Sequence, residues 1–131
     1  MNKIRILLAD DNEMMRNALA LFLETDADVD VVAQAVDGHD VLAQLDAACP
    51  DVICMDVNMG TLNGMETTRQ VLMLQPRVRI IGLSAHADRT FVAAMVEAGA
   101  VGYVVKGNAG LELLAAIHAV HQGRTFFSAQ S

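Results

Sequence analysis

Acidic residues directly follow two of the apolar runs of this chain. Asp10 and Asp11 come after Ile4–Ala9, and Asp56 comes after Asp51–Met55. A buried charge without a partner is costly, so carboxylates in such places are expected to be hydrated, paired with a cation or reactive. Asp10 and Asp11 alone could equally cap a following helix.

Other polar groups at the ends of apolar runs complement these carboxylates. Val78–Ser84 ends in a hydroxyl, Lys106 follows Val101–Val105, and Asn58 lies just beyond the third aspartate. Clustered carboxylates repel one another unless a cation lies among them, and oxygen donors suit Mg²⁺, which keeps waters that phosphoryl oxygens can replace. With Ser84 as a hydrogen-bond donor and Lys106 as a balancing charge, the set predicts phosphoryl transfer with a carboxylate as acceptor.

These residues must be positioned by alternating strands and helices. Near-continuous, β-branched apolar runs are typical of strands buried on both faces, and five of them occur, at Ile4–Ala9, Val29–Ala35, Asp51–Met55, Val78–Ser84 and Val101–Val105. Five βα units predict an α/β fold with a parallel sheet, helices on both faces and right-handed crossovers. Ligands of such sheets bind outside the carboxyl ends of the strands, so the polar residues above should meet there.

Apolar stripes at helical spacing separate the runs. They comprise Met15, Ala18, Leu19, Phe22 and Leu23; Val41, Leu42 and Leu45; Met65, Val71, Leu72 and Leu74; Phe91, Val92, Met95 and Val96; and Leu113, Leu114, Ile117 and Val120. Asp37 and Asp88 are expected to cap the second and fourth helices, and Gly99 and Gly123 to follow the fourth and fifth.

Composition limits the functional classes. The 131 residues predict one domain with an aliphatic core, since 53% are hydrophobic and 4% aromatic. The net charge of −7 argues against direct nucleic-acid binding by this segment. The sequence predicts neither a signal peptide nor a membrane span, and a cytoplasmic location is expected. Cys49 and Cys54 have no metal or redox spacing and are expected to be buried or half-buried.

The combined pattern resembles the receiver domain of two-component response regulators over nearly the whole chain. The resemblance implies a flavodoxin-like, five-stranded sheet in the order 2-1-3-4-5 with five helices. It implies that Asp56 accepts the phosphoryl group and that Asp10, Asp11, Asp56 and the backbone carbonyl of Asn58 bind Mg²⁺. It also implies that Lys106 contacts the phosphoryl group, that Ser84 and Tyr103 form a switch pair, and that a sensor histidine kinase is the partner. Such a domain is a regulator and no enzyme beyond its own phosphorylation and dephosphorylation.

The segment after Gly99 resembles the NarL/FixJ subfamily, whose members usually carry a C-terminal LuxR-type helix-turn-helix. This implies a receiver domain over 1–123 and the start of a linker or tail over 124–131. DNA binding would then belong to a C-terminal domain absent from this chain. A stand-alone receiver that acts only through protein contacts is the alternative. Gly60 and Gly107 depart from the family, which often has proline at both positions.

Two other classes fit less well. A haloacid dehalogenase-type phosphatase wants DxDxT, but the chain has DVNMGT, with Asn58 in place of the acid/base aspartate. No phosphate-binding glycine motif follows the first strand, which argues against a nucleotide-binding module. Of the histidines, His86 is near enough to Ser84 to modulate water access, whereas His118 and His121 lack a supporting carboxylate in the sequence.

The fourth helical stretch is poor in charge, because Glu97 alone interrupts Thr90 to Ala100. Its four larger apolar residues are expected to face the sheet, leaving Ala93, Ala94 and Ala98 outside. An apolar outer face of this kind, with the adjoining fifth helix, is consistent with a homodimer interface.

Overall fold

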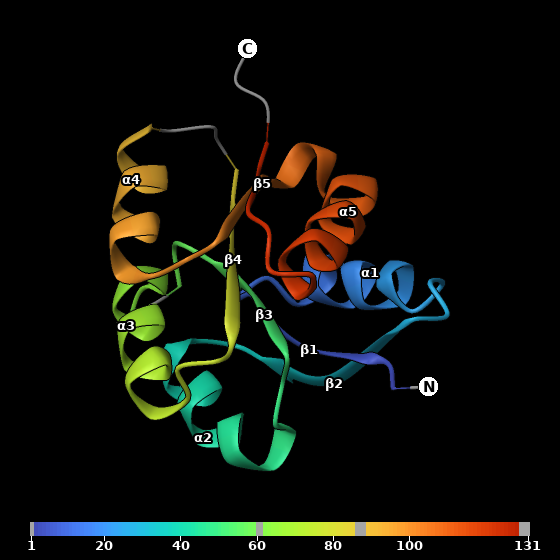
Figure 1. Cartoon of the computed structure of the whole chain (residues 1–131), viewed down its shortest axis with the longest axis horizontal. Helices are drawn as coiled ribbons and strands as arrows, with labels where there is room; N and C mark the ends of the chain where they lie inside the picture. The colour runs from blue at the N-terminus through green and yellow to red at the C-terminus, as the bar shows by residue number, and fades with distance from the viewer. Residues whose placement is uncertain (1, 60–61, 86–88, 129–131) are drawn as a thin grey trace.

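The computed structural model describes residues 2–59, 62–85 and 89–128. Its centre is a six-stranded sheet in the order β2-β1-β3-β4-β5-β6, in which every neighbouring pair is parallel (Figure 1). The strands are β1 (Ile4–Ala9), β2 (Val29–Ala35), β3 (Val52–Asp56), β4 (Arg79–Ser84), β5 (Gly102–Val105) and β6 (Phe126–Phe127). The predicted 2-1-3-4-5 order is confirmed, and the sixth strand was not predicted.

Helices cover both faces of the sheet. Figure 1 shows α1 and α5 on one side and α2, α3 and α4 on the other. Their bounds are α1 (Glu13–Leu23), α2 (Gly38–Ala48), α3 (Gly64–Leu74), α4 (Arg89–Ala98) and α5 (Ala109–His121), with a 3₁₀ turn, η1 (Lys106–Asn108), leading into α5. One α-helix follows each of β1 to β5, which is the doubly wound arrangement that the sequence predicted.

Two aliphatic cores result, one on each face. Leu8, Cys54 and Leu83 pack under α1 and α5, whereas Leu7 and Ile53 pack under the helices of the other face. Because successive strand residues point to opposite faces, strands that are apolar at every position supply both cores.

The helix boundaries follow from capping. Asn12 caps α1 by accepting from the Met15 N–H at 3.0 Å, so the interpretation of Asp10 and Asp11 as the cap is wrong. Asp37 caps α2 as predicted, accepting from Asp40 N–H at 2.8 Å. Asp88, the predicted cap of α4, lies outside the described residues.

Three expectations about exposure are corrected. Cys49, which ends α2 in a left-handed conformation with φ 45°, is exposed, while Cys54 is buried as expected. On α4, Ala98 faces the core and Val96 is 46% exposed, the reverse of the prediction. Ala98 lies three residues after buried Met95 and therefore on the same face of α4, whereas Val96 lies on another face.

Candidate functional site

Adjacent strands deliver three carboxylates to the carboxyl edge of the sheet. Residue Ala9 of β1 pairs with Met55 of β3, so Asp10 and Asp56 follow side by side. One carboxylate oxygen each of Asp10, Asp11 and Asp56 lie within 4.8 Å of one another. Asp10 and Asp56 are buried, and Asp11 is exposed. The sequence-predicted acidic cluster therefore exists, open to solvent on the Asp11 side.

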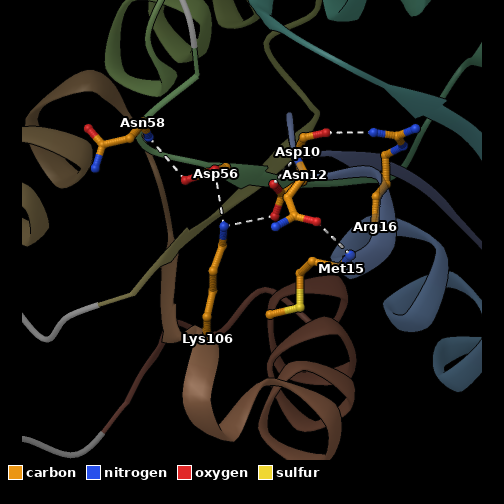
Figure 2. A network of polar contacts seen from close by, with 7 residues as sticks. All are labelled: Asp10, Asn12, Met15, Arg16, Asp56, Asn58 and Lys106. Carbon is orange, nitrogen blue, oxygen red and sulfur yellow. Dashed lines mark hydrogen bonds and ion pairs between the residues drawn. The ribbon is translucent and has the colours of Figure 1, made fainter.

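Lys106 places a cation between the two buried carboxylates. Its Nζ lies 2.8 Å from Asp10 Oδ2 and 3.1 Å from Asp56 Oδ2, and Figure 2 shows the side chain extending between them. Asp10 Oδ2 is buried and receives no well-aligned hydrogen bond from the described residues, so its contact with Lys106 is an ion pair. One ammonium thus compensates part of the charge of three carboxylates.

The electrostatics of the pair have two opposing causes. Burial raises the pKa of the Asp56 carboxyl, although the Asn58 N–H and Lys106 act to lower it. Burial acts to lower the pKa of Lys106, but its contacts with the Asp10 and Asp56 carboxylates outweigh burial and raise that pKa. Lys106 is therefore a permanent cation at neutral pH, and Asp56 is a carboxylate with enhanced proton affinity.

Backbone donors fix the orientation of both buried carboxylates. The Asn12 N–H donates to Asp10 Oδ1 at 2.9 Å, and the Asn58 N–H donates to Asp56 Oδ1 at 3.0 Å (Figure 2). Each carboxylate thus has one oxygen held by the chain two residues ahead and the other turned toward Lys106. The Asn58 side chain itself is exposed.

Arg16 supports the site and was not predicted. It is buried, and its Nη1 donates to the carbonyl oxygen of Asp10 at 2.8 Å while Nε donates to Gln34 Oε1 at 3.1 Å. Leu19, Ala20 and Leu23 are the other buried residues of α1. A charged residue at the first position of an i, i+3, i+4, i+7 buried stripe is the sequence signal that could have found it.

Gly64 lets α3 begin against the strand that carries the acceptor. A Cβ at this position would lie 2.7 Å from the carbonyl oxygen of Asp56 and 2.8 Å from Val57 Cα. The Gly64 N–H bonds the Val57 carbonyl at 3.1 Å, which closes the loop after β3. Only glycine allows this approach without moving the backbone that holds Asp56.

Ser84 and Tyr103 lie on neighbouring strands beside the cluster. Ser84 is the last residue of β4 and pairs in register with Val105, one residue before Lys106. Tyr103 is 2% exposed and packs in the core under α3 and α4. Both side chains are therefore buried, Tyr103 on the strand that leads into Lys106 and Ser84 on the strand beside it.

Of Gly60, Gly107 and His86, only Gly107 lies among the described residues. No peptide bond among the described residues is cis, so Gly107 follows Lys106 through a trans bond and continues into η1. Gly60 and His86 lie outside the described residues.

His118 contacts carboxylates that the sequence did not place beside it. Its Nε2 lies 2.8 Å from Asp26 Oδ2, and Asp28 is close to both, while His121 is not part of this group. The hydrogen bond from His118 lowers the pKa of Asp26, with a further contribution from the Asp28 N–H. This contact joins the turn after α1 to α5.

Fold and site together define a doubly wound α/β domain with an acidic, oxygen-lined cation site at the carboxyl edge. The chain matches the response regulator receiver domain over residues 6–118 and belongs to that family. Domains of this family are regulatory, receive signals from histidine kinases and generally bind Mg²⁺ at an acidic pocket. The donor set here, with three carboxylates and a buried oxygen that lacks a well-aligned donor, fits that ion.

Relatives support the same family. The chain is 34% identical over 125 residues to the transcriptional regulatory protein DegU of Brevibacillus brevis, covering 95% of this chain and 53% of DegU. It is 38% identical over 120 residues to LiaR of Bacillus subtilis, covering 92% and 57%. The chain thus spans about half the length of the curated relatives it matches.

Solved structures agree with this assignment. A LuxR-family two-component response regulator from Aurantimonas sp. SI85-9A1 is similar, with a TM-score of 0.91 and 31% identity over 95% of this chain and 89% of that one. Within the residues described for this chain, no helix has the length and apolar character needed to cross a bilayer.

Proposed function

We propose that this chain is a phosphorylation-controlled switch in which Asp56 accepts a phosphoryl group from a histidine kinase. The observation that carries the proposal is the convergence of Asp10, Asp11 and Asp56 within 4.8 Å, with Lys106 Nζ 3.1 Å from Asp56 Oδ2. A buried, cation-flanked carboxylate at a sheet edge is suited to be a nucleophile, because its charge is compensated while one side stays open to a donor.

The transfer itself is a displacement at phosphorus. An Asp56 carboxylate oxygen forms the new O–P bond, and the N–P bond of the kinase phosphohistidine breaks, its electron pair returning to the imidazole. Lys106 holds an oxygen of the incoming group, and Asp10, Asp11, Asp56 and the Asn58 carbonyl would hold Mg²⁺. The ion, when bound, supplies positive charge against the phosphoryl oxygens.

The response would run through Ser84 and Tyr103. The Ser84 hydroxyl is one strand away from Lys106, in register with Val105, and can turn toward a phosphoryl group on Asp56. Tyr103, packed inward in this conformation, would follow into the space that is vacated. Phosphorylation would shift the balance between two existing conformations rather than create a new fold.

Phosphorylation on Asp56 is tested with acetyl phosphate and Mg²⁺ followed by mass spectrometry. Wild type should gain one phosphoryl group, mapped to Asp56, and Asp56→Asn should gain none. Asp51→Asn, which alters an aspartate before β3 rather than at its end, is the control and should remain phosphorylated. An adduct of equal stoichiometry in Asp56→Asn would exclude this acceptor.

The output proposed is control of transcription through a C-terminal LuxR-type domain beyond this chain. The named relatives are transcriptional regulatory proteins of about twice this length, which supports it. The stand-alone receiver is the second candidate. The gene sequence past Ser131 separates them: a helix-turn-helix supports the first, and a stop codon the second.

The kinase partner and the free thiol of the exposed Cys49 favour a cytoplasmic location. The proposed division is a receiver over 1–123 followed by a linker.

Dimerisation through α4 and α5 is also proposed. Val96 is 46% exposed and Ala93 is exposed on a helix with little charge, which favours a partner there. Sedimentation with beryllofluoride and Mg²⁺ should show a dimer for wild type and a monomer for Val96→Glu. Val36→Glu alters a valine that is 48% exposed outside these helices and should still dimerise. A wild type that stays monomeric at high concentration would reject the interface.

A further inference from the structure

The segment after α5 returns to the sheet and ends against the strand that leads to Lys106. Residues Phe126–Phe127 form β6, parallel to β5, and Ser128 follows at the carboxyl edge. Ser128 is 8% exposed, and its N–H donates to the Tyr103 carbonyl at 2.8 Å. These residues lie beyond the part of the chain that matches the receiver family, which ends at residue 118.

The Ser128 hydroxyl continues the ladder of β5 and β6 with a side-chain oxygen. The Val105 N–H donates to Ser128 Oγ at 3.0 Å, and Ser128 Oγ donates to Glu112 Oε1 at 2.6 Å. A hydroxyl can donate one hydrogen bond, and Ser128 donates it to Glu112. The hydroxyl oxygen therefore accepts from the Val105 N–H through a lone pair. Ser128 therefore bridges the end of β5 to the first turns of α5.

Val105 is the residue immediately before Lys106, and Tyr103 lies two residues earlier on the same strand. Both contacts that Ser128 makes with β5 thus fall on the strand that carries the proposed switch residue and precedes the phosphoryl-contacting lysine. Lys106 Nζ lies 2.8 Å from Asp10 Oδ2. The Val105 N–H that bonds Ser128 belongs to the Val104–Val105 peptide, which is one peptide before the base of the Lys106 side chain.

We propose that Ser128 is a positioning residue for Lys106, and that through it the segment after α5 and the phosphoryl site influence each other. Glu112 orients the Ser128 hydroxyl, and that hydroxyl fixes the Val104–Val105 peptide. The position of Val105 in turn sets the base of the Lys106 side chain. A phosphoryl group that draws Lys106 or Tyr103 to a new position would in turn alter the bonds of Ser128. The inference rests on the proposed function of Asp56 and Lys106.

The test compares three variants of the full chain. Ser128→Ala removes the hydroxyl, Ser128→Thr keeps it, and Thr125→Ala removes an exposed hydroxyl of the same segment as the control. Phosphorylation by acetyl phosphate at saturating Mg²⁺ should slow about fivefold or more in Ser128→Ala, because small misplacements of a positioned group lower the rate of transfer. Ser128→Thr should restore most of the rate, and Thr125→Ala should match wild type.

A purely structural role predicts a different result. Ser128→Ala would then lower the free energy of unfolding and leave the rate of the folded protein unchanged, which would overturn the proposal. Should Ser128→Ala fail to fold, hydrogen exchange of wild type decides: beryllofluoride with Mg²⁺ should change the protection of the Val105 and Ser128 amides. Unchanged protection would reject the coupling. If wild type takes up no phosphoryl group, the proposed function fails instead.

Discussion

At the carboxyl edge of the sheet charged side chains are crowded together, whereas at the amino edge they are bound to separate backbone groups. Asp10, Asp11 and Asp56 lie together, and the ammonium of Lys106 pairs with Asp10 and Asp56. At the other end, Arg5 Nη2 donates to the Ala48 carbonyl at 2.7 Å. Charged residues therefore join neighbouring elements at the amino edge. At the carboxyl edge they form a site in which the negative charge is only partly compensated.

At the amino edge, charged side chains contribute hydrogen bonds that hold neighbouring elements together. The last carbonyls of α2 carry partial negative charge, and Arg5 also donates to the Cys49 carbonyl at 3.2 Å. The Arg5 N–H donates to Asp51 Oδ2 at 2.9 Å, which joins β1 to the residue before β3. Arg5 and Asp51 thus find their hydrogen-bond partners within the protein. At the carboxyl edge, by contrast, repulsion among carboxylates is left for a bound cation to relieve.

The largest effect expected from this comparison is on Mg²⁺ binding. Asp11→Ala removes an exposed carboxylate of the cluster and should weaken Mg²⁺ binding at least about tenfold, as loss of a metal-binding group does. The free energy of unfolding should stay within about 0.5 kcal/mol of wild type, because no described backbone group depends on Asp11. Calorimetric titration and urea unfolding measure the two. Asp30→Ala, on β2, should leave the affinity unchanged, and equal affinity of Asp11→Ala and wild type would refute the cation site.

The second effect is on stability at the amino edge. Arg5→Ala should lower the free energy of unfolding by about 1–3 kcal/mol, because the carbonyls at the end of α2 lose a charged donor. Mg²⁺ affinity should not change. Arg77→Ala, an exposed arginine at the same edge, is the control and should cost less than about 0.5 kcal/mol. A stability loss no larger in Arg5→Ala than in Arg77→Ala would show that both edges tolerate loss of charge alike.

The smallest effect is a pH dependence of stability from Asp26. Its pKa is lowered in the folded protein by His118, so ionised Asp26 stabilises the fold above its ordinary pKa of 3.8. That contribution should disappear as pH falls through the lower, folded value. Urea unfolding at pH 7 should therefore show wild type more stable than Asp26→Asn, with the difference shrinking below about pH 4. A constant difference for Asp26→Asn at all pH values would contradict the contact between Asp26 and His118.

Much of the site followed from local sequence pattern. Apolar runs of strand length located β1, β3 and β5, and the parallel topology requires the residues after them, such as Asp10 and Lys106, to share one edge. The reason is geometric. The apolar pattern of the sequence sets where each strand ends, and in a parallel sheet all carboxyl ends of the strands lie at the same edge. The roles of these residues remain proposals, but their proximity needed no knowledge of tertiary contacts.

Other features depended on contacts between distant parts of the chain. Arg16 reaches the Asp10 carbonyl only because α1 packs on the sheet, and Asp26 meets His118 across 92 residues of sequence. β6 has only two residues, too short for a periodic signal, and exists because Ser128 and its neighbours bond to β5. Periodicity along the sequence determined which residues stand at the strand ends. Packing of α1, α5 and the returning segment decided which backbone groups hold them, because such bonds form only once the elements meet.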